Sequence, residues 1–168
     1  TLYVADIDRI LSFHNIDSSL DNPTYEVFFS DLPSDRHHGW KFLRFSPEGE
    51  LIIPVGAPCN VCEAPTEKHS RLFALNMKSK ELREIASGIR NTVGFDFHPA
   101  TGELWFSDNG ADMMGDDIPP DEINKISKQG SHFGYPYFHA GDIADPKFSK
   151  GKLARDYEPP VLKLGAHV

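Results

Sequence analysis

One motif occurs twice along the chain, and it limits the possible folds more than any other feature. Residues 45–51 (FSPEGEL) match residues 97–104 (FHPATGEL) with one inserted residue. The offset between the copies is 52 residues at the phenylalanine and 53 at the leucine. Each copy reads as the end of a strand, a tight turn that needs glycine, and the start of a second strand. A repeat of about 50 residues that carries four short strands predicts a β-propeller, in which each blade is one four-stranded sheet.

Short apolar runs rich in β-branched and aromatic residues surround the repeat. Their lengths and partial alternation predict strands, although LREIAS and DEINKIS could each form a single helical turn. Two further pairs of runs correspond between the copies, 9–11 with 71–73 and 25–32 with 82–89. The alternative is a β-sandwich with two hairpins that are similar by chance. The runs are LYVADI (2–7), RILSFHN (9–15), YEVFFSDL (25–32), FLRFSP (42–47), ELIIPVG (50–56), RLFALNM (71–77), LREIASGI (82–89), VGFDFHP (93–99), ELWFSDN (103–109) and EINKISK (122–128).

The length of the chain fits only part of a closed propeller. At about 50 residues a blade, the 168 residues supply about three blades, whereas propellers close with roughly four to eight. The chain opens inside a strand-like run, TLYVADI, and ends at residues 164–168 in what reads as the start of another strand. We therefore expect an all-β fold with about three antiparallel blades, a partial domain over residues 1–168 that is truncated at both ends.

The charge balance argues against a nucleic-acid partner, and the hydropathy argues against a membrane span. The chain has 17 Lys and Arg against 25 Asp and Glu, a formal net charge of −8. An acidic chain is unsuited to nucleic acid, because binding requires a basic face that neutralises phosphates. No run of about 18 apolar residues exists, so we expect no membrane span.

Two polar clusters precede predicted strands. Residues 35–40 (DRHHGW) place two histidines in a turn, where an imidazole that titrates near neutrality can act as a general base. The alternative is an ordinary surface turn. Arg90 and Asn91 can present a guanidinium fork and an amide to a planar ligand that bears carboxylates. Their alternative is a cap at the start of a strand.

Six carboxylates lie from Asp108 to Glu122, with no Lys or Arg among them. They repel one another unless they are solvated or neutralised by a cation. Together with Asn109 and backbone carbonyls they form a hard oxygen donor set, which suits Ca²⁺ better than zinc. The spacing does not match an EF-hand loop. We expect calcium here, with a solvated acidic loop as the alternative.

The two cysteines, Cys59 and Cys62, form a CxxC motif. Glu63 follows it, which excludes c-type haem attachment because that requires histidine. A zinc site would need two more ligands, with His69 the only close candidate. The loop signals around Pro65 argue against a thioredoxin-like site. A small local disulfide in an oxidising compartment is the favoured interpretation.

Together these stretches resemble the soluble quinoprotein sugar dehydrogenases, the glucose/sorbosone dehydrogenase family. The resemblance is carried by HHGWKFLRFSPEGELIIPVGAPCNVCE (37–63) and RNTVGFDFHPATGELWFSDNGADMMGDDIPPDEINKISKQGSHFGYPY (90–137). The second stretch is the more specific, because RN, GELWFSDNG, the DDIPPDEIN loop and FGYPY occur in order. The APCNVCE stretch is most similar to the sorbosone-type branch.

The resemblance implies a six-bladed propeller that binds pyrroloquinoline quinone (PQQ) over its axis, with Ca²⁺ beside the quinone. His38 matches the general base, which takes the proton of the substrate hydroxyl while hydride passes to the quinone. Arg90 and Asn91 match the pair at the polar edge of the cofactor. Gly110 and Ala111 match backbone-carbonyl calcium ligands, and Glu122 matches the carboxylate ligand.

The chain also departs from the family pattern. The loop between Gly110 and Glu122 is longer than in glucose-oxidising members, and Phe133 stands where some relatives have tyrosine. Basic cofactor contacts from later blades have no counterpart, so we expect one side of the PQQ site and no activity from this segment alone.

The resemblance implies that the parent protein oxidises an aldose or related sugar or polyol. It would then pass the electrons to a separate acceptor, and we expect a periplasmic or secreted location. The alternatives are a calcium-dependent propeller lactonase and a non-enzymatic propeller that binds a partner.

Overall fold

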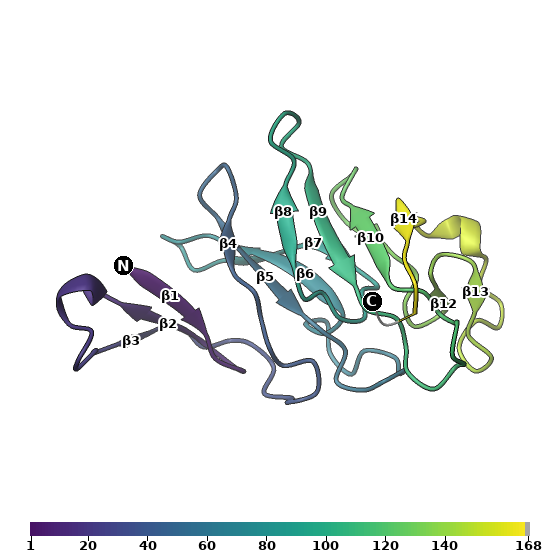
Figure 1. The fold of residues 1–168 in the computed structure, drawn as a ribbon, viewed down its shortest axis with the longest axis horizontal. Helices are drawn as coiled ribbons and strands as arrows, with labels where there is room; N and C mark the ends of the chain where they lie inside the picture. Colours follow the sequence, from purple (N-terminus) through teal and green to yellow (C-terminus); the bar gives the residue numbers. More distant parts are fainter. Residues whose placement is uncertain (167–168) are drawn as a thin grey trace.

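The computed structural model describes residues 1–166, which fold into short strands arranged as successive sheets (Figure 1). The first sheet contains β1 (Leu2–Ala5), β2 (Ile10–Phe13) and β3 (Glu26–Phe29), hydrogen-bonded in that order. The second contains β4 (Arg44–Phe45), β5 (Leu51–Val55), β6 (Arg71–Leu75), β7 (Leu82–Ser87) and, parallel to β7, β11 (Ser131–His132). The third contains β8 (Phe95–Phe97), β9 (Leu104–Asp108), β10 (Glu122–Lys125) and β14 (Leu162–Lys163). A ribbon of β12 (Phe138–His139) and β13 (Ile143–Ala144) and two 3-10 helices, η1 (Ile16–Ser18) and η2 (Ala154–Asp156), are the remaining elements described.

The repeated motif forms the same hairpin in the second and third sheets. Phe45 pairs with Leu51 in one copy and Phe97 pairs with Leu104 in the other, so matched residues occupy matched positions. The turn glycine has a φ of 84° in the first copy and 72° in the second, with open space where a Cβ would stand. The backbone conformation, rather than crowding, therefore requires glycine at this turn.

The three sheets are consecutive blades of a β-propeller, as the repeat predicts. In each of them the antiparallel strands follow one another in sequence from one edge to the other. The expected four antiparallel strands are present in β4–β7 and in the set of β8, β9, β10 and β14. The first sheet has three strands, and β11 adds a fifth, parallel strand to the second.

The middle sheet is buried on both faces because its alternate side chains enter two different cores. Along β5, Leu51, Ile53 and Val55 pack toward the first sheet, while Ile52 packs toward the third. Every residue of β5 is buried, as expected for a strand between two layers. The core between the second and third sheets is Ile52, Leu72, Ala74, Ala86, Ile89, Phe95, Leu104, Phe106 and Phe133.

The two runs with possible helical turns are strands, β7 and β10. The elements that the sequence did not predict are β11–β14 and the 3-10 helices, all two or three residues long. Such pieces are too short to show a period in the sequence. The strand start predicted at residues 164–168 is wrong for residues 164–166, because β14 ends at Lys163 and no strand follows it in the described part of the chain. Residues 167–168 lie outside that part. Within that part, no helix is long and apolar enough to cross a membrane.

Candidate active site

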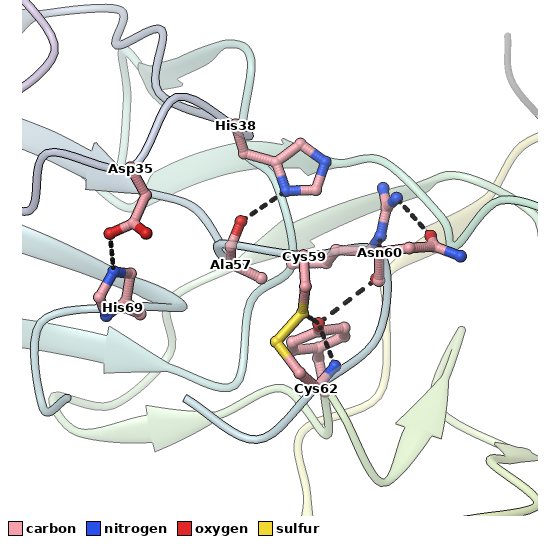
Figure 2. The surroundings of a disulfide bond; sticks show 9 residues. Asp35, His38, Ala57, Cys59, Asn60, Cys62 and His69 are labelled. Carbon is pink, nitrogen blue, oxygen red and sulfur yellow. Dashed lines mark hydrogen bonds and ion pairs between the residues drawn. A yellow bond between two sulfur atoms is a disulfide. The ribbon is translucent and has the colours of Figure 1, made fainter. Parts of the chain in front are cut away.

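His38 lies in the turn that leads into β4, and its ring has a fixed orientation. Its φ of 50° is in the left-handed region, which residues other than glycine rarely adopt and which recurs at functional positions. Nδ1 lies 2.9 Å from the carbonyl oxygen of Ala57 (Figure 2). A carbonyl only accepts hydrogen bonds, so Nδ1 carries the proton and Nε2 keeps its lone pair. The sequence-predicted base is therefore in the tautomer that accepts a proton at Nε2.

The surroundings of His38 keep its ring neutral. Burial of the half-exposed ring, followed by the positive charge of Arg90 and the neighbouring His37, lowers the pKa of His38 to about 4. The rings of His37 and His38 are edge to face, with centroids 4.0 Å apart. A neutral imidazole at pH 7 is the form that a general base requires.

An open cavity of about 530 Å³ lies beside His38. The predicted cofactor residue Asn91 lines the same cavity, so the structure brings these two predicted residues together. Trp40 also lines it, with 92% of its surface exposed. The complete lining is Arg36, His37, His38, Trp40, Lys41, Phe42, Asn91 and Val93.

Three hydrogen bonds anchor the turn that carries His38. Asp35 accepts a hydrogen bond from the buried ring of His69 at 3.0 Å (Figure 2). The Lys41 ammonium donates to the carbonyls of Ile7, at 2.6 Å, and Gly39, at 2.8 Å. The turn is thereby tied both to the first sheet and to the segment that follows β5.

Arg90 is buried, with only 5% of its side chain exposed, and its guanidinium is held by the chain itself. Nε donates to the carbonyl of Asn60 at 2.9 Å and Nη2 to the side-chain oxygen of Asn60 at 2.8 Å. Nη1 donates to the Asn109 carbonyl at 3.2 Å, and Nη2 also reaches the Asp112 carboxylate at 2.9 Å. The guanidinium of Arg90 is thus hydrogen-bonded to other groups of the protein, whereas the sequence predicts a guanidinium that is open to a ligand. Its contact with a cofactor stays a prediction.

The backbone at Arg90 and Asn91 is also capped. Their N–H groups donate to the two carboxylate oxygens of Asp108, at 2.9 Å and 2.6 Å. The alternative interpretation, a cap at the start of a strand, therefore describes the backbone correctly. Asn91, whose backbone is capped in this way, also lines the cavity beside His38.

Two buried carboxylates, Asp108 and Glu122, are paired residues on β9 and β10. Burial, followed by the nearby Glu122 charge, raises the pKa of Asp108, and burial raises the pKa of Glu122. The predicted ligands Gly110 and Ala111 line the same small cavity, of about 10 Å³. That volume matches one water or ion, and a cation there would offset the repulsion between the carboxylates. Carboxylate and carbonyl oxygens are the donors that calcium binds. Arg90 also lines this cavity, and a calcium ion there stays a prediction.

Half of the carboxylates in the acidic segment are buried, so the alternative of a solvated acidic loop describes only the other half. Asp108, Asp121 and Glu122 are buried at its base, and Gly110 N–H donates to Asp121 at 2.7 Å. The other three carboxylates, Asp112, Asp116 and Asp117, are exposed. Among residues 1–166, no group of three or more His, Cys, Asp or Glu side chains is placed to hold a metal ion. Any cation in the small cavity must therefore rely on backbone carbonyls as well.

Cys59 and Cys62 form a disulfide, which confirms the interpretation of the CxxC motif (Figure 2). Sequence reasoning missed the residues around it that contact the predicted site: Ala57, Asn60 and Tyr135. The Tyr135 hydroxyl lies 3.6 Å from Cys59 Sγ and accepts a hydrogen bond from the Cys62 N–H at 3.0 Å. The one sequence signal for these contacts was the short CNVC motif at residues 59–62, and it did not indicate which residues would contact it.

Comparison with known proteins places the chain in a family. The family model described as glucose/sorbosone dehydrogenase matches residues 73–165, more than half of the chain. An uncharacterized protein of Borreliella burgdorferi is 34% identical over 179 residues, which cover 99% of this chain and 47% of that protein.

Two solved structures share the fold. The calcium structure of a Trichoderma reesei enzyme of Carbohydrate-Active Enzymes family AA12 superposes with a TM-score of 0.81 at 20% identity, over 99% of this chain and 53% of that one. The PQQ-bound aldose sugar dehydrogenase of Streptomyces coelicolor superposes with a TM-score of 0.68 at 17% identity, over 97% of this chain and 48% of that one. The chain thus spans about half the length of the proteins it matches. By its family model, which matches more than half of its residues, the chain belongs to the glucose/sorbosone dehydrogenase family.

Proposed function

We propose that the chain is part of a PQQ-dependent dehydrogenase of aldoses or related polyols, of the sorbosone-type branch. Family membership supports the class of reaction, and APCNVCE supports the branch. The observation that carries the proposal is the contact of His38 Nδ1 with the Ala57 carbonyl, because it leaves Nε2 as a proton acceptor beside an open cavity.

The proposed roles follow from the geometry. His38 takes the proton of the substrate hydroxyl at Nε2. The Asn91 amide and the exposed Arg36 offer hydrogen bonds to a carboxylate-bearing ligand, and Trp40 offers an aromatic face to a planar one. Bound PQQ supplies the acceptor for the hydride of the substrate carbon. The cavity volume of about 530 Å³ falls within the range of ligand sites.

We further propose that Gly110, Ala111 and Glu122 hold Ca²⁺ in the small cavity beside Asp108. The buried carboxylate pair supports a cation there, since two such groups repel each other. The cavity of about 10 Å³ has room for one ion. His38 and the Arg90–Asn91 pair have no evident duty in the calcium-bound water mechanism of a lactonase, and this favours the dehydrogenase over that alternative.

We also propose that the chain is a partial propeller within a periplasmic or secreted protein, whose electrons leave to a separate acceptor. The exposed side chains of Leu2, Val4 and Val27 on the first sheet suit packing against a further blade. The Cys59–Cys62 disulfide supports an oxidising compartment.

The test is reconstitution of the full-length protein. It is incubated with PQQ and Ca²⁺, supplied with a panel of aldoses and polyols, and followed by reduction of an artificial electron acceptor. We expect sugar-dependent reduction only when PQQ is present. Lactone hydrolysis without quinone, together with no sugar oxidation, would instead establish the lactonase.

A further inference from the structure

The disulfide-bridged turn carries Asn60, and the polar atoms of this residue contact the candidate site. Its backbone carbonyl accepts from Arg90 Nε at 2.9 Å and from the Tyr135 hydroxyl at 3.3 Å. Its side-chain oxygen accepts from Arg90 Nη2 and from the Asp112 N–H, each at 2.8 Å. Its side-chain nitrogen donates to the Asp112 carbonyl at 2.9 Å. Asn60 therefore grips one edge of the guanidinium with two acceptors and fixes the plane of the group.

Arg90 depends on this grip because its charge is buried. A guanidinium with 5% of its side chain exposed must find acceptors within the protein. Two side chains accept hydrogen bonds from the guanidinium, those of Asn60 and Asp112, and of the two only Asn60 belongs to the disulfide-bridged turn. Loss of the Asn60 side-chain oxygen would leave a buried N–H without that partner and let the guanidinium rotate.

The residues just before this turn contact the proposed catalytic histidine, His38. Ala57 donates its N–H to the Arg90 carbonyl at 2.8 Å and accepts from His38 Nδ1 at 2.9 Å. Figure 2 shows Ala57 beside His38 and Asn60 beside the disulfide, on one continuous segment. His38 and Arg90 are thus held by neighbouring residues of this segment, His38 through Ala57 and the guanidinium through Asn60.

The disulfide is placed to hold Asn60. It encloses only Asn60 and Val61, with 6.1 Å between the Cα atoms of Cys59 and Cys62. A disulfide that closes so short a loop mainly restricts the conformation of that loop, because it removes little conformational entropy from the unfolded chain as a whole. Both cysteines are half-buried, so a small reductant has access to them.

We propose that Asn60 is a positioning residue for Arg90, and that the Cys59–Cys62 disulfide keeps Asn60 in place, so that reducing the disulfide weakens cofactor binding. The inference rests on the proposed function, in which Arg90 lies at the polar edge of PQQ. In the redox step a dithiol breaks the S–S bond, the protein gains two thiols, and the dithiol is oxidised to its own disulfide. The Cys59–Cys62 pair is then a redox control on cofactor affinity.

The experiment measures PQQ affinity by quenching of tryptophan fluorescence in the full-length protein, since Trp40 lines the cavity. The apo protein is reduced with dithiothreitol, its thiols are alkylated, and the reagents are removed before PQQ is added. Parallel samples are Asn60→Ala, the Cys59→Ser/Cys62→Ser double variant, and Val61→Ala as the matched control from the same turn. The double variant is also carried through the reduction.

We expect the Kd for PQQ to rise about 10–100-fold in the reduced protein, in Asn60→Ala and in the double variant. Val61→Ala should match the untreated protein, and reductant should not change the double variant further. At saturating PQQ, kcat of Asn60→Ala should stay within about threefold of wild type, because Ala57 and not Asn60 holds His38. A general loss of folding would instead lower kcat and the melting temperature together.

The outcomes separate the two proposals. If wild type binds PQQ and the reduced protein and Asn60→Ala bind it equally well, the inference is wrong and the proposed function stands. A kcat loss in Asn60→Ala without a change in Kd also overturns it. If the intact wild type does not bind PQQ, the proposed function fails and takes the inference with it.

Discussion

The carbonyl oxygen of Ala57 lies 2.9 Å from Nδ1 of His38, and this contact decides which nitrogen of the ring accepts a proton. The acceptor must be Nε2, because the carbonyl can only accept the Nδ1 proton. The pKa of His38, lowered by burial and by Arg90, keeps Nε2 unprotonated at neutral pH. The geometry and charge around one histidine thus agree with the role of a general base.

The first prediction concerns pH. Burial and Arg90 lower the pKa of His38 to about 4, below the ordinary value of 6.5. Protonation of Nε2 removes the base, so kcat/KM should fall as pH drops through about 4 and stay level between pH 5 and 7 as far as His38 is concerned. The measurement is a pH profile of kcat/KM at saturating PQQ. An acid limb between pH 6 and 7 would mean that the ring is as solvated as a free imidazole.

Gly56 should be intolerant of a side chain because it lies against His38. A Cβ at residue 56 would stand 2.5 Å from the Cβ of His38 and 3.2 Å from the Arg90 carbonyl oxygen. Gly56→Ala should therefore displace the base and lower kcat about 10²-fold, as misplacement by about 1 Å can do. Gly94→Ala is the matched control, since no atom lies within 4 Å of its Cβ position. Equal kcat in the two variants would contradict the packing described for His38.

Glu122 should be required for calcium. Glu122→Gln removes one of two buried carboxylates at the small cavity, and with it the charge that attracts a cation. At a Ca²⁺ concentration of 100 Kd, wild type should gain about 2.7 kcal/mol of stability, and the variant should gain none. Equilibrium dialysis and thermal unfolding with and without Ca²⁺ measure this. The exposed Asp116, changed to Asn, is the control, and equal calcium content in Glu122→Gln and wild type would reject the site.

Phe106 should be a major contributor to the packing of the second blade on the third. It is 1% exposed, and its ring packs edge to face on Phe133 with centroids 4.9 Å apart. Phe106→Ala should lower the free energy of unfolding by about 3–5 kcal/mol. Leu20→Ala, at a residue 71% exposed, should change it by less than about 0.5 kcal/mol. Urea unfolding compares the two, and similar losses would mean that the blades are not joined at Phe106.

The hairpin repeat could be predicted from sequence because its signals are local. The pairings of Phe45 with Leu51 and of Phe97 with Leu104 follow from a strand, a glycine turn and a second strand within eight residues. The blades follow from the spacing of the repeat. The short elements β11–β14 left no such period in the sequence.

Parts of the site escaped prediction because they depend on contacts between distant residues. Arg90 is held by Asn60, 30 residues away, and no pattern in either segment indicates the other. The burial of Asp108, by contrast, had a signal. Alternate residues of a strand lie on the same face, so Asp108 shares a buried face of β9 with Leu104 and Phe106. The interpretation of residues 108–122 as one group of carboxylates did not use this alternation.

The most direct test of the central claim is the turnover of His38→Asn in the full-length protein loaded with PQQ and Ca²⁺. Asparagine tolerates the left-handed backbone at this position and removes the imidazole. We predict that kcat for sugar oxidation falls about 10²–10⁴-fold while the Kd for PQQ is unchanged, and that His37→Asn keeps kcat near wild type. A His38→Asn enzyme that turns over as fast as His37→Asn would show that His38 is not the base.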